Sequence, residues 1–141
     1  MAFRDDVSIN SLIGPGTAVS GNLQASGFTR IDGDIDGNLT IDGKLIIGDK
    51  ARVRGDIFAT SAIVGGVVEG DILAPEGVQL FATASVIGDI VAQEIKMDEN
   101  VLFQGSCIII RDKERFEKEK LQWQDKRALL QKTKLNTQEN I

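Results

Sequence analysis

A short tripeptide, a glycine followed by Asp or Asn and then by an aliphatic residue, recurs along most of this chain of 141 residues. An apolar residue stands two positions before each glycine, and the successive spacings are 16, 18, 15, 18 and 17 residues when a degenerate last copy is counted. A repeat of this kind constrains the fold more than any local motif. The copies are Gly21-Asn22-Leu23, Gly37-Asn38-Leu39, Gly55-Asp56-Ile57, Gly70-Asp71-Ile72, Gly88-Asp89-Ile90 and Gly105-Ser106-Cys107.

A period near 17 residues is too short for a βαβ unit, which needs about 30 residues. It suits one coil of a parallel β-solenoid with three short strands and three tight corners. Stacked coils lie about 4.8 Å apart, so that equivalent residues align into ladders. The sequence therefore predicts an all-β, three-sided parallel β-helix of about six coils. Two inward ladders are expected, one of Val19, Ile35, Val53, Val68, Val86 and Phe103 and one of Leu23, Leu39, Ile57, Ile72, Ile90 and Cys107.

The stretch from Ile31 to Ile47 alternates apolar or glycine positions with polar ones, which is typical of extended backbone with one buried face. At 17 residues it is too long for one strand, and its glycines at 33, 37 and 43 are interpreted as corners. Its start is similar to a calcium-binding EF-hand loop, but Gly43 stands where a bidentate Glu is required. A hexapeptide spacing also begins here and then lapses, and the chain has no histidine to serve as the base of an acyltransferase.

Charged residues mark the outer surface of the predicted solenoid. Asp36, Arg54 and Glu69 precede successive glycines and would form a stack of alternating sign. Three aspartates that follow the glycines would form a stack of like charge, which corner hydrogen bonds to the backbone would explain. These are Asp56, Asp71 and Asp89.

The net charge of the chain changes sign after Ile110. Residues 1–110 carry 15 acidic and 7 basic side chains, net −8, which argues against nucleic-acid binding. Cys107 is the only cysteine and is expected to be a small buried hydrophobe on the last coil. We expect no cofactor, no metal site and no catalytic residue, since one cysteine without any histidine forms neither a thiolate and imidazole metal site nor a Cys-His pair.

The segment from Arg111 to about Leu135 lacks glycine and proline and is predicted to be a helical tail, with a disordered end at residues 136–141. It carries 6 acidic and 9 basic residues, net +3. One apolar stripe has a spacing of seven, and a second stripe lies about 140° around the helix. The alternatives are a frayed helix, a helix that lies on the solenoid, and a helix that associates with another copy, binds a partner or caps the solenoid. The stripes are Phe116, Trp123 and Leu130, and Leu121, Ala128 and Leu135.

Residues 1–13 form an N-terminal tail of mixed character, interpreted either as a loose end or as a short membrane-contacting segment. The residues that would touch a membrane are Phe3, Val7, Leu12 and Ile13. The first 30 residues contain no run typical of a signal peptide, and no stretch approaches the ~18 apolar residues of a membrane span. A cytoplasmic location is expected, with a peripheral position at the inner face of the cytoplasmic membrane as an alternative.

Residues 14–110, the predicted β-helix domain, resemble the bactofilins, a family of bacterial cytoskeletal proteins. The resemblance implies a right-handed, three-sided β-helix that polymerises end to end without nucleotide, with roles in cell shape, cell-wall synthesis or scaffolding at the membrane. The matching residues are Ile13-Gly14-Pro15-Gly16-Thr17, Gly21-Asn22-Leu23, Ile31-Asp32-Gly33 leading into Gly37-Asn38-Leu39, the later Gly-Asp-Ile triplets, and Phe103-Gln104-Gly105.

Elementary physics points the same way, because a solenoid exposes unpaired strand edges at its two ends. The last coil is apolar and offers no polar cap of the kind that keeps solenoids monomeric. We therefore expect a self-assembling scaffold and not an enzyme, with two alternatives: an adaptor capped by its C-terminal helix that binds cell-wall enzymes, and, remotely, a relative of hexapeptide acyltransferases. The predicted polymer contacts are Val19, Leu23, Phe28, Val101, Phe103 and Ile109.

Overall fold

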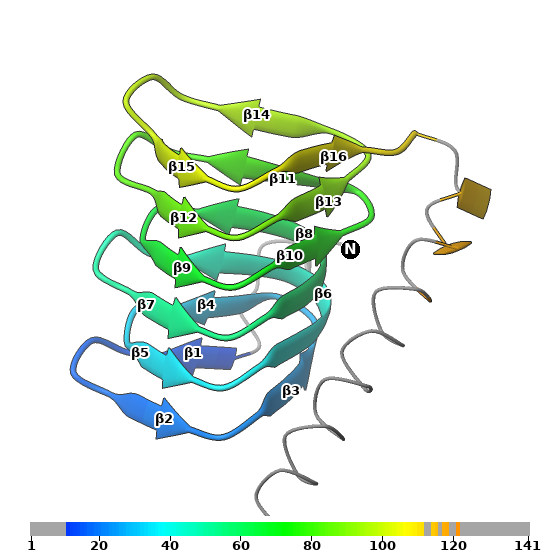
Figure 1. Cartoon of the computed structure of the whole chain (residues 1–141). Helices are drawn as coiled ribbons and strands as arrows, with labels where there is room; N and C mark the ends of the chain where they lie inside the picture. Colours follow the sequence, from blue (N-terminus) through cyan, green and yellow to red (C-terminus); the bar gives the residue numbers. More distant parts are fainter. Residues whose placement is uncertain (1–10, 112–113, 116, 119–120, 122–141) are drawn as a thin grey trace, which may run out of the picture.

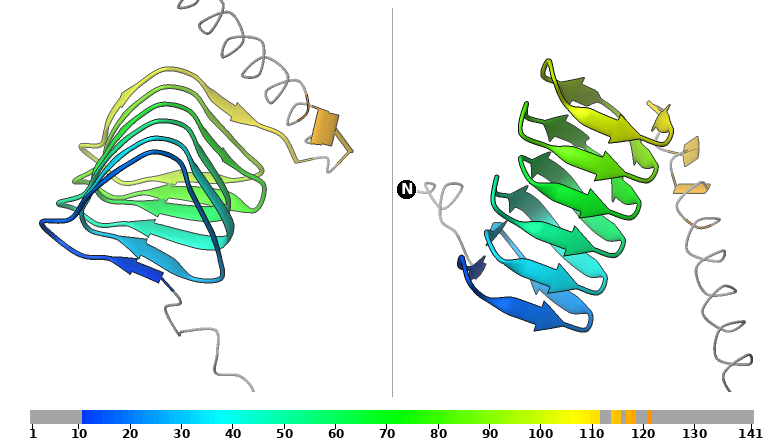
Figure 2. Two further views of the ribbon diagram at one scale, coloured as in Figure 1. Left: turned by 90° about the horizontal axis from the view of Figure 1, so that it is seen from below. Right: turned by 60° about the vertical axis from the view of Figure 1, so that its left-hand side comes forward.

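Short parallel strands stack in columns and form an all-β solenoid of six coils (Figure 1). The computed structural model describes residues 11–111, 114–115, 117–118 and 121. Every strand pair in this part of the chain is parallel, as expected when each coil returns to the same face. Viewed along the axis, successive coils superimpose closely (Figure 2).

The first column of strands is a six-stranded sheet, and each strand is three residues long. Its middle residues form the first predicted ladder, since Val19 pairs with Ile35, Val53 with Val68 and Val86 with Phe103. From the N-terminal end the strands are β2 (Ala18–Ser20), β5 (Asp34–Asp36), β7 (Arg52–Arg54), β9 (Val67–Glu69), β12 (Ser85–Ile87) and β15 (Leu102–Gln104).

The other two columns share a ten-stranded sheet, because two long strands run through a corner and contribute to both. Strand β6 shifts its register between Ile41 and Lys44, at the corner predicted at Gly43. The second column holds β3 (Leu23–Ser26), the first part of β6 (Leu39–Ile47), the first part of β8 (Ile57–Val64), β10 (Ile72–Ala74), β13 (Ile90–Ala92) and β16 (Cys107–Ile109). The third holds β1 (Ser11–Ile13), β4 (Thr29–Ile31), the ends of β6 and β8, β11 (Gly77–Leu80) and β14 (Ile95–Met97).

The second predicted ladder is also confirmed by the pairing, from Leu23 and Leu39 at one end to Ile90 and Cys107 at the other. In the four inner coils the inward side chains of both ladders are at most 2% exposed. The expectation for Cys107 is wrong in one respect: the residue occupies its predicted rung but is exposed. It belongs to the last coil, and no further coil of this chain covers it.

Asparagine and aspartate side chains join the coils at the corner after the first column. Each Oδ1 accepts a hydrogen bond from the backbone N–H of the equivalent residue one coil further on, at 2.9–3.0 Å. This confirms that corner aspartates satisfy the backbone and explains the stack of like charge. We call this column the Asx ladder; it comprises Asn22, Asn38, Asp56, Asp71, Asp89 and, as the last donor, Ser106.

The alternating charges of the first column also pair as predicted. Arg54 lies between Asp36 and Glu69 in the register, and its Nε is 3.9 Å from the Glu69 carboxylate. Both side chains are about half exposed, so this contact contributes little to stability. Beyond Arg111, the described positions 114, 115, 117, 118 and 121 have helical backbone, and the rest of the predicted helical tail lies outside the described residues.

Candidate functional site: the two ends of the solenoid

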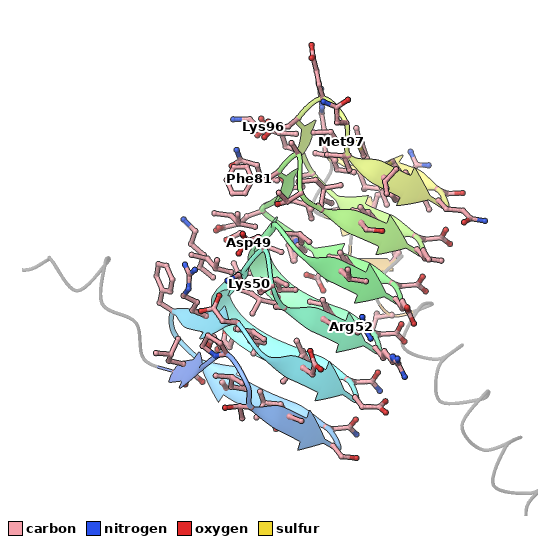
Figure 3. The ribbon with its side chains drawn as sticks, turned by 90° about the vertical axis from the view of Figure 1, so that its left-hand side faces the viewer. Asp49, Lys50, Arg52, Phe81, Lys96 and Met97 are labelled. Atoms are coloured by element: carbon pink, nitrogen blue, oxygen red, sulfur yellow. The ribbon has the colours of Figure 1, made fainter. Side chains whose placement is uncertain are left out.

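The C-terminal end of the solenoid presents inward-facing side chains that no further coil of this chain covers. Phe103 is half-buried above the fully buried Val86, and Ile109 is 52% exposed although Ala92, its partner one coil earlier, is completely buried. Met97 is 43% exposed above Leu80, which is 0% exposed, and lies at this end in Figure 3. The same ladders are therefore closed inside the molecule and open at its last coil.

The N-terminal end repeats this arrangement with smaller side chains. Val19 and Leu23 are half-buried and pack against the core, and Ala25 takes the same position beneath Ile41. Ile13 is also an inward residue, because it pairs with the fully buried Ile31. Both ends are thus apolar surfaces in the plane of a coil, bordered by strand edges.

The structure places five of the six predicted contact residues at these two ends. Val19 and Leu23 lie at one end, and Val101, Phe103 and Ile109 lie at the other. Phe28 lies apart from the ladders, at the corner before β4, where the Lys44 ammonium sits 5.7 Å from the centre of its ring.

Sequence reasoning missed the third column at the C-terminal end. Ile95 and Met97 are the last residues of the inward ladders that contain Val78 and Leu80. Their signal was present in the alternation of Ile95, Lys96 and Met97, but this stretch lies outside the repeated tripeptide that guided the prediction.

The residues predicted to touch a membrane are divided by the structure. Leu12 and Ile13 belong to β1, where Leu12 points outward and is 62% exposed while Ile13 points inward. Phe3 and Val7 lie outside the described residues. No helix in the described part of the chain is long and apolar enough to cross a membrane.

The inward side chains at both ends of the solenoid are apolar. Partial burial raises the pKa of the Cys107 thiol, and the nearby Asp89 carboxylate raises it to a smaller extent, so the thiol stays neutral. Among residues 11–111 and the few described beyond them, no three His, Cys, Asp or Glu side chains are grouped to hold a metal ion. The hollows of this part of the solenoid lie on its outer faces, one of them lined by Lys44, Glu76 and Lys96.

A parallel β-solenoid that leaves apolar strand edges open at both ends has the features of a class of proteins able to pair with further copies at those edges. The match to a family model narrows this class: the model, described as Bactofilin: Polymer-forming cytoskeletal, covers residues 11–108. The chain belongs to the bactofilin family.

A curated relative agrees with this membership over part of its length. The chain is 35% identical over 71 residues to bactofilin BacP of Myxococcus xanthus (strain DK1622). The aligned region covers 50% of this chain and 30% of that relative, so the chain spans less than a third of the relative's length. No solved structure matches the chain.

Proposed function

We propose that this protein is a structural scaffold that assembles end to end into filaments without a nucleotide and supports bacterial cell shape or cell-wall organisation. The observation that carries the proposal is the change in exposure along each inward ladder. Equivalent residues are at most 2% exposed in the inner coils, while Ile109 is 52% exposed at the last coil. A second molecule stacked on either end would turn terminal coils into inner ones.

The energetics of such a joint favour stacking. Full burial of a side chain such as Phe103, Ile109 or Met97 contributes roughly 1.5–3 kcal/mol, and these partly exposed residues would gain a fraction of that each. The strand edges of coil one and coil six would also gain the backbone hydrogen bonds that inner coils already make. No nucleotide enters this scheme, so protein concentration and salt would govern assembly. Residues 1–110 carry net −8, which would oppose lateral bundling at low salt.

Phe103→Arg tests the joint. Its long charged side chain would have to be buried between two coils, so we expect the β signal in circular dichroism to remain and filaments to disappear in negative-stain electron microscopy. Leu102→Arg is the matched control, because Leu102 is on the same strand but points outward and is 69% exposed. Filaments of normal length in Phe103→Arg, or equal loss in both variants, would refute the proposed joint.

Ile109→Lys is a second variant with little risk to folding, since its side chain is already 52% exposed. Loss of filaments in this variant, with an unchanged unfolding midpoint, would place the defect in assembly and not in the fold. The resemblance also implies a right-handed solenoid, which agrees with the preference of parallel crossover connections.

A second candidate is an adaptor that does not polymerise, whose C-terminal helix caps the solenoid and whose faces bind cell-wall enzymes. Exposed Ile87 and Leu102 on the first column, 49% and 69% exposed, favour a partner-binding face. Deletion of residues 111–141 separates the two: an adaptor would begin to aggregate or polymerise, whereas a scaffold would polymerise with or without the tail.

Peripheral attachment to the membrane remains a separate proposal, and the outward Leu12 is its support in the described residues. Co-sedimentation with anionic vesicles should fall in Leu12→Asp if this residue contributes. Equal binding by Leu12→Asp and the unmodified protein would exclude a contribution from β1.

A further inference from the structure

Four apolar residues form a continuous stripe on the outside of the second column. Each follows an inward residue, so it points outward, and register pairs Leu73 with both Phe58 and Val91, and Val91 with Ile108. The first two coils carry polar residues at this position, Gln24 and Thr40. We call the residues of coils three to six the outer stripe; they are Phe58, Leu73, Val91 and Ile108.

Two members of the outer stripe are buried although they point outward. Leu73 is 1% and Val91 7% exposed, whereas Ile87, an outward residue of the first column, is 49% exposed. Ile87 also has a ladder neighbour on each side, Glu69 and Gln104, so the presence of neighbours does not account for the difference. The stripe is therefore covered from outside the solenoid.

The chain itself turns onto the outer stripe after its last coil. Ile110 is 3% exposed and packs with Leu73 and Val91 in a cluster separate from the core, against which Phe58 also packs. Its backbone N–H donates to the Ala92 carbonyl at 2.9 Å, which holds this turn against coil five. The tail thus leaves the solenoid on the stripe, and residues 112–141 follow directly.

The tail carries an apolar row that matches the polarity of the stripe. Its apolar residues at positions 116, 123 and 130 recur every seven residues, so that in a helix they lie close to one face. The outer stripe is likewise a row of apolar residues, one on each of four successive coils.

The described tail residues indicate which helical face turns outward. Positions 114, 115, 117, 118 and 121 are helical, and all five side chains are exposed. At 100° per residue, each lies about 100° or more from Phe116 around the helix. Leu121, of the second apolar row, is 58% exposed. A helix that continues this pattern would turn the row of Phe116, Trp123 and Leu130 away from solvent.

We propose that residues 112–135 bind as a helix along the outside of the second column of their own solenoid, with Phe116 and Trp123 on the outer stripe and Leu130 beyond it, toward coil one. The seven residue steps from Phe116 to Trp123 span about 10 Å in a helix, and the fourteen steps to Leu130 span about 21 Å. The outer stripe spans about 14 Å over four coils, and a helix that starts at coil six must run back toward coil one. The helix lies along the side of the solenoid, so both ends stay open, and the proposal does not rest on filament formation.

Trp123 is the only tryptophan of the chain, so its fluorescence reports this contact in the full-length protein. We expect blue-shifted emission and protection from acrylamide quenching, both independent of protein concentration. Leu73→Asp should shift the emission to the red and remove the protection, while Ile87→Asp, an outward residue of the first column, should change neither. Circular dichroism would verify that both variants keep the β signal.

The tail supplies a second, reciprocal pair of variants. Phe116→Asp should expose Trp123, whereas Leu121→Asp, at an exposed position, should not. Solvent-like emission in the unmodified protein, or an emission unaffected by Leu73→Asp, would overturn the proposal. Protection that appears only as protein concentration rises would also overturn it, because a second copy would then be the occupant. Filaments are scored separately by microscopy, so failure here and failure of the end-to-end joint are distinguishable.

Discussion

The Asx ladder allows the contribution of one side chain to be separated into a hydrogen bond and a charge. Asn38 lies in coil two, where its Oδ1 accepts a hydrogen bond of 2.9 Å from the N–H of Asp56 in a partly buried position. The backbone N–H of Asn38 donates a hydrogen bond to Asn22 Oδ1, and this bond does not involve the Asn38 side chain. Asn38→Ala therefore removes one acceptor and leaves the Asp56 N–H to compete for water.

The two possible substitutions have different magnitudes and different salt dependence. Losing the hydrogen bond should cost about 0.5–1.5 kcal/mol, with little effect of salt. Asn38→Asp keeps the acceptor but adds a carboxylate one coil, about 4.8 Å, from Asp56. The repulsion is about 0.9 kcal/mol at the dielectric constant of water and about 3.5 kcal/mol at the effective value of about 20 found near a protein surface. This second cost should fall near 1 M salt, where the Debye length is about 3 Å.

Urea unfolding followed by circular dichroism would measure both variants at low and high salt. The Phe103→Arg background, once shown to block filaments, removes the contribution of assembly to the midpoint. We expect Asn38→Asp to recover stability as salt rises and Asn38→Ala to stay equally destabilised at both salt concentrations. Equal destabilisation of the two variants at high salt would show that the Oδ1 acceptor does not support the ladder.

Three further predictions concern single positions. Gly55→Ala should cost more than about 2 kcal/mol in urea unfolding, because φ is +151° and a Cβ would collide with the Gly37 carbonyl; an unchanged midpoint would contradict this stacking. Thr29→Val should stabilise the protein by about 1 kcal/mol, because the buried Thr29 hydroxyl has no hydrogen-bond partner among the described residues. A loss of stability would instead indicate that a bound water satisfies this hydroxyl. Burial, and to a smaller extent Asp89, raises the pKa of Cys107, so its alkylation, which needs the thiolate, should be slower than that of a free thiol at about pH 8 and should reach its midpoint at a higher pH. A midpoint below that of a free thiol would be inconsistent with this environment.

The ladders were predictable because the fold repeats one local rule. In every copy, the residue two positions before the glycine and the residue two positions after it face inward, and the pairing of Val53 with Val68 follows from the period alone. Exposure was less predictable. Cys107 takes the inward position of Ile90, yet it is exposed because solvent access depends on the presence of a next coil and not on alternation.

The outer stripe shows a second reason for incomplete prediction. A second apolar residue follows the inward one in the last four copies, for example Leu73 after Ile72. The signal was visible in the sequence, but alternation assigns such a residue to solvent. Only the burial of Leu73 and the position of Ile110 reveal that this outer surface is covered.

The Asx ladder also gives the solenoid a direction. In every rung the later coil contributes the backbone N–H and the earlier coil contributes the side-chain oxygen. A joint between unlike ends can continue the ladder from the Ser106 hydroxyl to the first coil of the next molecule. A joint between like ends must interrupt it. A filament with an unbroken Asx ladder would therefore have all its subunits in the same orientation. A filament whose ladder is interrupted at its joints would have subunits in alternating orientations.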